Sequence, residues 1–178
     1  MKTVIFAAAA AVAAISAPAF AQDAAPFTGA HAELLAGYDK IDTNSVIGSP
    51  DGFLYGLNLG YDYQVGSAVL GIEGEVSDAT TNFDYVGGEL DAERDLYIGG
   101  RVGFQVGDLA LLYVKAGYTN ARLKDTLAGG ANADGVRVGG GIEYKLGGQL
   151  LVKGEYRYSN YEAGLERHQV LAGLGIRF

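Results

Sequence analysis

Charged residues recur at every second position in several stretches of the chain, and the same face of these stretches carries many of the glycines. Acids and bases are mixed on this face, so its residue types favour ion pairing between carboxylates and arginine or lysine. Glycine beside long side chains leaves the room that a narrow interior needs. The residues of this predicted interior network are Glu33, Asp39, Asp62, Glu73, Glu75, Arg101, Lys115, Arg137, Glu143, Lys145, Lys153, Glu155, Arg157, Arg167 and Arg177.

The period of two predicts β-strands, because successive side chains of a strand point to opposite faces. The predicted strands span about 29–39, 53–63, 68–77, 95–106, 109–121, 135–146, 150–160 and 167–178. Strands of about ten residues are long enough to cross a bilayer at a tilt. The connections alternate long and short, as in barrels with short turns at one end. We therefore predict an all-β fold: an eight-stranded antiparallel up-and-down transmembrane β-barrel.

The opposite face of each predicted strand is apolar and carries aromatic residues near its ends. In a barrel with an apolar core the charged face would be solvated, and glycines there would only weaken the strands. The pattern therefore predicts that the apolar face meets lipid and that aromatic rings form a girdle at each interface. The predicted girdle residues are Tyr38, Tyr63, Phe104, Tyr118, Tyr144, Tyr158 and Phe178.

The first residues have the three regions of a secretory signal peptide. Lys2 supplies the positive charge, residues 4–15 form an apolar run, and Ala19-Phe20-Ala21 fits the cleavage site. We predict a signal peptide at 1–21 and an outer-membrane β-barrel domain at 22–178. The segment 22–28 is expected to be a short polar lead-in to the first strand.

The composition excludes several classes of function. The formal net charge of −8 leaves no basic patch for nucleic acid, and the absence of cysteine excludes disulfides and thiolate chemistry. No sequence pattern matches a calcium loop or a phosphate-binding loop, so we predict no metal site and no cofactor. The acids of the second long connection are expected to form a solvated outer loop, with divalent-cation binding beside lipopolysaccharide as the alternative. They are Asp78, Asp84, Glu89, Asp91 and Glu93.

The final stretch, RHQVLAGLGIRF, ends on Phe178 with its apolar face outward. It resembles the assembly signal of Gram-negative outer-membrane barrels, and the predicted mature chain resembles the small eight-stranded barrels of the outer membrane protein A and X type in the porin family. The resemblance implies location in the outer membrane and contact with its lipid and lipopolysaccharide. It also implies recognition of Phe178 by the barrel-assembly machinery. The sequence names no partner for the outer loops.

The residues around the two histidines do not favour an enzymatic function. Barrels similar to outer-membrane lipid A deacylases use a His-x-Ser arrangement with an acid on the exterior. Here Val170 stands two residues after His168, and Glu33 stands two residues after His31. Ser159 is predicted to face inward. We therefore predict no catalytic residues, and we expect each histidine to be a lone polar residue near an interface.

The expected function is structural: envelope integrity or surface interaction, by a barrel whose interior is plugged with ion-paired side chains. An eight-stranded barrel is just wide enough for side chains to fill it. A narrow porin-like channel for small solutes is the alternative, and a lipid A-modifying enzyme is a more distant one.

Overall fold

The computed structural model describes residues 25–42, 51–80, 82–85, 88–125, 129–162 and 165–178. The predicted signal peptide, 1–21, lies outside these residues. Among the residues described, none belongs to a helix long and apolar enough to cross a membrane. The described ranges contain nine strands: β1 (Gly29–Asp42), β2 (Asp51–Val65), β3 (Ala68–Ala79), β4 (Asn82–Tyr85), β5 (Gly88–Val106), β6 (Ala110–Asp125), β7 (Gly129–Gly147), β8 (Leu150–Tyr161) and β9 (Leu165–Arg177).

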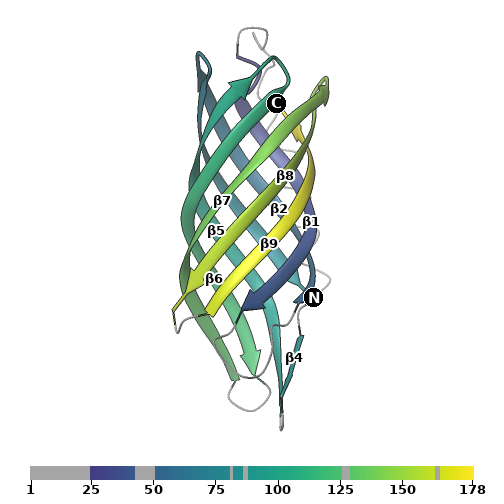
Figure 1. Cartoon of the computed structure of the whole chain (residues 1–178), viewed down its shortest axis with the longest axis vertical. Helices are drawn as coiled ribbons and strands as arrows, with labels where there is room; N and C mark the ends of the chain where they lie inside the picture. The colour runs from purple at the N-terminus through teal and green to yellow at the C-terminus, as the bar shows by residue number, and fades with distance from the viewer. Residues whose placement is uncertain (1–24, 43–50, 81, 86–87, 126–128, 163–164) are drawn as a thin grey trace.

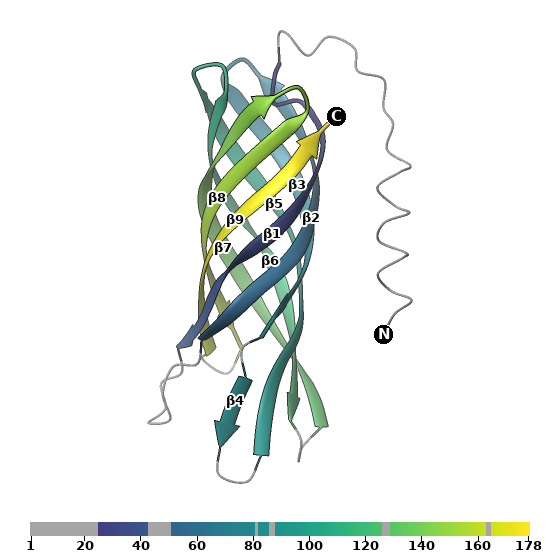
Figure 2. The same ribbon diagram turned by 90° about the vertical axis from the view of Figure 1, so that its right-hand side faces the viewer.

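Eight of these strands close into an antiparallel barrel. Consecutive barrel strands pair with one another, β3 pairs with β5, and β1 pairs with β9 to complete the ring. The short strand β4 pairs with β5 and lies beyond the barrel wall (Figures 1 and 2). The predicted fold class, an eight-stranded up-and-down barrel, is therefore confirmed.

Strand length differs from the prediction at one end of the barrel. The segments 78–94 and 122–134 were expected to be loops, but β5 begins at Gly88 and the β6–β7 ladder continues to the pair Asp125 and Gly129. Figure 2 shows these extensions at the end opposite the C-terminus. A hairpin whose strands are already paired can continue its hydrogen bonds into water, where polar residues suit both faces. The polar composition of these segments therefore does not imply loops.

The other end of the barrel carries three short turns. Gly66, Gly107 and Gly148 have φ angles of 60°, 65° and 58° in these turns. Such angles are open to glycine at no steric cost, which explains why each tight connection contains one. We call this end the short-turn end and the opposite one the long-strand end.

Glycine has a different role on each side of the wall. A Cβ atom built on the inward-facing Gly37 would lie 2.3 Å from the carbonyl oxygen of Val170 and 2.6 Å from the Cβ of Leu171. A Cβ built on the outward-facing Gly154 would have no neighbour within 4 Å. Inward glycines are thus required by the crowded interior, whereas outward ones are not.

This contrast gives a paired test. We expect Gly37→Ala to lower the free energy of unfolding by about 1–3 kcal/mol, because the added methyl overpacks the interior. Gly154→Ala should leave it unchanged or raise it slightly, since glycine weakens a strand interior by roughly 0.5–1 kcal/mol. Urea unfolding in lipid vesicles, followed by the heat-dependent gel shift, measures both. Equal losses in the two variants would contradict the steric role of the inward glycine.

Candidate functional site

The barrel interior is filled by charged side chains from all eight barrel strands. The structure places every residue of the predicted network on the inner face. All of them are buried except Lys145, which is half-buried at the short-turn end. Asp95, which the prediction omitted, is also buried there. The buried carboxylates are Glu33, Asp39, Asp62, Glu73, Glu75, Asp95, Glu143 and Glu155, and the buried cations are Arg101, Lys115, Arg137, Lys153, Arg157, Arg167 and Arg177.

At the short-turn end, two arginines and two carboxylates form a closed ring of ion pairs. Arg101 Nε donates to Asp62 Oδ1 at 2.8 Å, and Arg101 Nη2 donates to Glu143 Oε2 at 3.1 Å. Arg177 Nη1 donates to Asp62 Oδ2 and Arg177 Nη2 to Glu143 Oε1, each at 2.7 Å. These four residues come from β5, β2, β7 and β9. The ring therefore connects strands that are not neighbours in the wall.

In the middle of the barrel, Arg157 holds two carboxylates. Its Nη2 donates to Glu75 Oε2 and its Nε to Glu155 Oε1, both at 2.8 Å. The ammonium of Lys115 lies 3.1 Å from Glu155 and 2.5 Å from Glu73. Charge-assisted pairs of this kind are strong when all their partners are present. The middle of the barrel is therefore occupied by paired charges.

Toward the long-strand end, Asp39 and Asp95 accept hydrogen bonds from side chains of several strands. Arg167 forms a two-point contact with Asp39, with Nε–Oδ1 at 2.6 Å and Nη2–Oδ2 at 2.8 Å. Arg167 also donates to Asp95 at 3.0 Å. Arg137 and the Tyr161 hydroxyl donate to the same Asp95 carboxylate. Paired charges thus extend along the barrel axis.

The rings of two further inward tyrosines lie beside buried cations. The Tyr97 ring lies 4.6 Å from the Lys115 ammonium and 5.4 Å from the Arg137 guanidinium. The Tyr113 ring lies 5.1 Å from the Arg101 guanidinium. Cations over aromatic faces at these distances are attracted by the ring quadrupole.

The segment before β1 closes the short-turn end and is not a simple polar lead-in. Phe27 is 0% exposed and packs with Val69 and Leu111. Its backbone N–H donates to Gln64 Oε1 at 2.9 Å, and its carbonyl accepts from Arg177 Nη1 at 2.8 Å. In the sequence, the one indication that this segment closes the barrel end is an aromatic residue in a polar stretch.

The outer face is apolar over the barrel wall. Five predicted girdle residues, Tyr38, Tyr63, Phe104, Tyr118 and Tyr144, are exposed there, and Tyr158 and Phe178 are half-buried. The hydroxyl of Tyr38 donates to Asp51 at 2.7 Å. The backbone N–H of Phe178 donates to the carbonyl of Ala30 at 2.8 Å, at the seam between β9 and β1.

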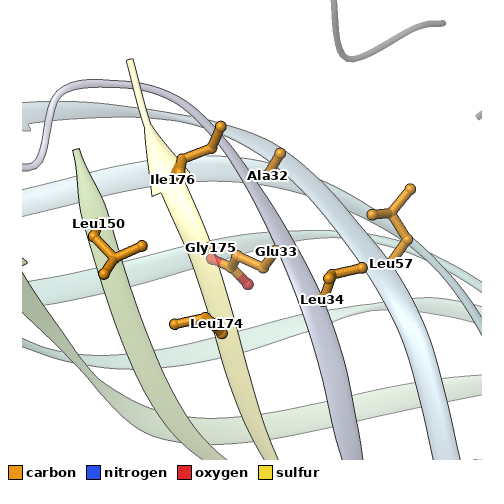
Figure 3. A pocket seen from close by; sticks show the side chains of 8 residues that line it. All are labelled: Ala32, Glu33, Leu34, Leu57, Leu150, Leu174, Gly175 and Ile176. Atoms are coloured by element: carbon orange, nitrogen blue, oxygen red, sulfur yellow. The ribbon is translucent and has the colours of Figure 1, made fainter. Parts of the chain in front are cut away.

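A shallow apolar groove of about 330 Å³ crosses the outer face over β1, β2, β8 and β9. Figure 3 shows leucine and isoleucine side chains around the smaller Ala32 and Gly175. Glu33 belongs to the lining, but its side chain is fully buried and pairs with Lys153 inside the barrel. The groove therefore presents hydrocarbon and no reactive group.

The histidines lie on opposite sides of the wall. His168 Nδ1 shares a 2.7 Å hydrogen bond with the Tyr156 hydroxyl on the outer face. Ser159 is inside, where its hydroxyl accepts from Arg137 Nε at 2.8 Å. The prediction that His31 is a lone polar residue near an interface is wrong. Its side chain is buried inside the barrel, with Nδ1 3.0 Å from Glu33 Oε1. Alternate residues of β1 face the interior, and His31 is one of them.

Asp78, from the acidic second connection, accepts a hydrogen bond from the Tyr55 hydroxyl at 3.2 Å. The side chains of the other four acids, Asp84, Glu89, Asp91 and Glu93, lie outside the described part of the structure. In the part that is described, no three His, Cys, Asp or Glu residues are grouped so that they could hold a metal ion.

Comparison with known proteins identifies similar barrels. Residues 7–178 match the family model described as outer membrane protein beta-barrel domain. A 25 kDa outer-membrane immunogenic protein of Brucella ovis is 28% identical over 80% of this chain and 72% of its own length. A 22 kDa outer membrane protein of Rhizobium leguminosarum is 27% identical over 67% of this chain and 63% of its own length.

Two solved structures share the fold. The Neisserial surface protein A has a TM-score of 0.62 at 17% identity, and the match covers 85% of this chain and 98% of that one. The attachment invasion locus protein of Yersinia pestis has a TM-score of 0.59 at 17% identity, covering 84% and 99%. At these identities the two structures show the architecture alone.

The interior pairs predict a large effect of removing one cation. Arg157→Met would leave Glu75 and Glu155 buried without their guanidinium, and should lower the free energy of unfolding by about 3–5 kcal/mol. The exposed Arg94→Met should change it by less than about 0.5 kcal/mol. Urea titration of folded protein in vesicles measures both variants. A loss below 1 kcal/mol for Arg157→Met would show that water, not Arg157, stabilises these carboxylates.

Proposed function

Because the chain belongs to the family of outer membrane protein β-barrel domains, we propose that it is a non-enzymatic barrel that supports envelope integrity and presents its long-strand end at the cell surface. Its location in the outer membrane follows from this family and from its outer-membrane relatives. In such barrels the short turns are periplasmic and the longer connections are extracellular. The short-turn end, closed by Phe27, would then face the periplasm.

The observation that carries the proposal is the filled interior. Arg101, Arg137 and Arg157 are each buried and bound to carboxylates of other strands, so they block the axis at successive levels. An eight-stranded barrel has room for side chains and little more. A barrel filled in this way can hold a structure at the cell surface, and that role does not require a path for solutes through its interior.

The long-strand end supports the surface role. There β5, β6 and β7 continue past the segments predicted as barrel strands, and β4 adds to the edge of β5. The name of the Brucella ovis relative, outer-membrane immunogenic protein, fits exposure of such a region to antibodies. The expected lipid partners are outer-membrane lipid and lipopolysaccharide, which the girdle residues would contact. The barrel-assembly machinery, reading Phe178, is the expected partner during assembly.

A narrow channel is the competing function, because the interior is charged along its length and could conduct if the side chains moved. We expect the purified barrel to show no steady conductance in planar bilayers. The heat-dependent gel shift of the same sample controls for correct folding and insertion. Steady ohmic currents from the unchanged protein would replace the structural proposal with the channel.

The envelope role predicts a defect in cells that lack the protein. Deleting the gene should increase leakage of periplasmic enzymes and sensitivity to detergent, while the lipid A mass spectrum stays unchanged. A variant with residues 82–91, which include β4 and the first residues of β5, replaced by a two-residue turn should restore the barrier in this strain. If this hairpin serves only to contact surface partners, the variant should lose any surface binding. An altered lipid A spectrum would favour a lipid-modifying enzyme instead.

A further inference from the structure

The segment that leads into β1 binds strands on both sides of β1 in the ring. The backbone N–H of Phe27 donates to Gln64 Oε1 of β2 at 2.9 Å, and the carbonyl of Phe27 accepts from Arg177 Nη1 of β9 at 2.8 Å. The ammonium of Lys145 of β7 donates to the carbonyl of Pro26 at 2.9 Å. These backbone groups lie outside the ladders of the wall, so side chains supply the partners that they need. The segment therefore connects β2 with β9 and β7 across β1.

The aromatic ring of Phe27 fixes this segment in the bore. The ring is buried against Val69 of β3 and Leu111 of β6. The Lys145 ammonium and the Arg177 guanidinium each lie 5.9 Å from the ring centre, a distance at which a cation is attracted to an aromatic face. The two cations that bind the backbone of the segment therefore also contact its ring. Removing the ring would weaken the hold of the segment on both of them.

The β1–β9 ladder, which lies beside this segment, differs from the other ladders of the barrel. Every other pair of neighbouring barrel strands is also joined by the chain that runs from one strand to the next, whereas β1 and β9 are joined by their ladder alone. The ladder reaches the segment at Ala30, whose carbonyl accepts from the N–H of Phe178 at 2.8 Å. At Gly29, which has a φ of 133°, an added Cβ would overlap the carbonyl oxygen of Phe178. The start of β1 is therefore shaped to receive the residue that follows β9.

We propose that the segment 25–28 is a clasp that holds the β1–β9 ladder closed at the short-turn end. Arg177 is its main contact, because Nη1 donates both to the Phe27 carbonyl and, at 2.7 Å, to Asp62 Oδ2 of β2. The last strand is thus bound to the clasp and to β2, past the intervening β1. This role does not depend on whether the protein conducts or binds a surface partner.

The contacts of the clasp divide into a local part and a part that needs the last strand. Gln64 and the segment bind each other twice, because the Gln64 N–H also donates to Thr28 Oγ1 at 3.0 Å. This pair belongs to the β1–β2 hairpin and requires no other strand. The donor for the Phe27 carbonyl, Arg177, comes only with β9. The clasp is thus prepared on the first hairpin and completed by the last strand. An opened ladder would leave backbone groups of both strands without partners in lipid, which the completed clasp opposes.

Two backbone amides test the clasp separately from the general stability of β9. The N–H of Phe178 donates across the β1–β9 ladder to Ala30, whereas the N–H of Arg177 donates to the carbonyl of Gln149 beside β8, at 2.8 Å. Opening of the ladder exposes only the first amide, and loosening of β9 exposes both. For the barrel in nanodiscs, we expect Phe27→Ala to speed hydrogen exchange at Phe178 at least about tenfold and at Arg177 less than about twofold. Equal acceleration at the two amides, or none at Phe178, would overturn the proposal.

Leu54→Ala is the matched control, because Leu54 is as fully buried as Phe27 but packs with Leu35 and Leu171 nearer the long-strand end. It should change the exchange of the two amides by the same factor. A selective rise at Phe178 in this variant would show that any lost apolar contact opens the ladder, and would refute the clasp.

A disulfide across the ladder provides a rescue experiment, since the chain has no cysteine of its own. Ala32 and Ile176 stand opposite each other on β1 and β9. Directly opposed residues of an antiparallel pair are close enough for a disulfide. Adding Ala32→Cys and Ile176→Cys to Phe27→Ala should return the exchange at Phe178 to within about threefold of the unsubstituted protein, because the covalent bond replaces the clasp. Mass spectrometry verifies that the disulfide has formed.

The control disulfide is Leu57→Cys with Val76→Cys, which are opposed on β2 and β3, two strands that a turn already joins. In the Phe27→Ala background it should leave the exchange at Phe178 fast. Rescue by both disulfides, or by neither, would mean that this amide does not exchange through opening of the β1–β9 ladder, and the clasp would be ruled out.

Discussion

Inside a bilayer there is no water to pair with a free backbone N–H or carbonyl, and this constraint governs the whole molecule. A sheet satisfies it only by closing on itself, which the ladder between β1 and β9 accomplishes. Closure with eight strands fixes a narrow bore. The narrow bore in turn requires glycine at inward positions such as Gly37, where even a methyl group would overlap the next strand. Backbone hydrogen bonding, wall curvature and interior composition are therefore consequences of one requirement.

The polar interior is the second consequence. Since the apolar faces meet lipid, the polar faces can be satisfied only by one another. The structure achieves this with pairs that cross the bore, such as Arg157 with Glu75 and Arg167 with Asp39. Replacing such pairs by hydrocarbon can be neutral for stability, but breaking one partner is costly. The network thus penalises any arrangement of the strands that leaves one of these charges without its partner.

The alternation of the sequence was enough to predict the barrel and the two sides of its wall. Because alternate residues of a strand face the same way, the sequence predicted that Arg101, Gly99 and Gly103 share the inner face. It could not predict which charges meet, because contacts across the bore depend on the stagger of all eight strands together. The partners of Arg177 illustrate this: Asp62 on β2 and Glu143 on β7 are both far away in the sequence and meet it only through the stagger of the closed barrel. The sequence did not predict that Phe27 closes the short-turn end, because the residues around it have the composition of a polar lead-in.

The pairs across the bore also determine when the molecule becomes complete. Arg157 and Glu75 are 82 residues apart in the sequence, Arg167 and Asp39 are 128 apart, and Arg177 and Phe27 are 150 apart. Contacts between such distant residues form late, because closing a long loop costs chain entropy before any contact rewards it. Until β9 reaches β1, the pairs that join these two strands across the bore, such as Arg167 with Asp39, cannot form. The charged lining of the bore is therefore complete only when the ring between β1 and β9 is closed.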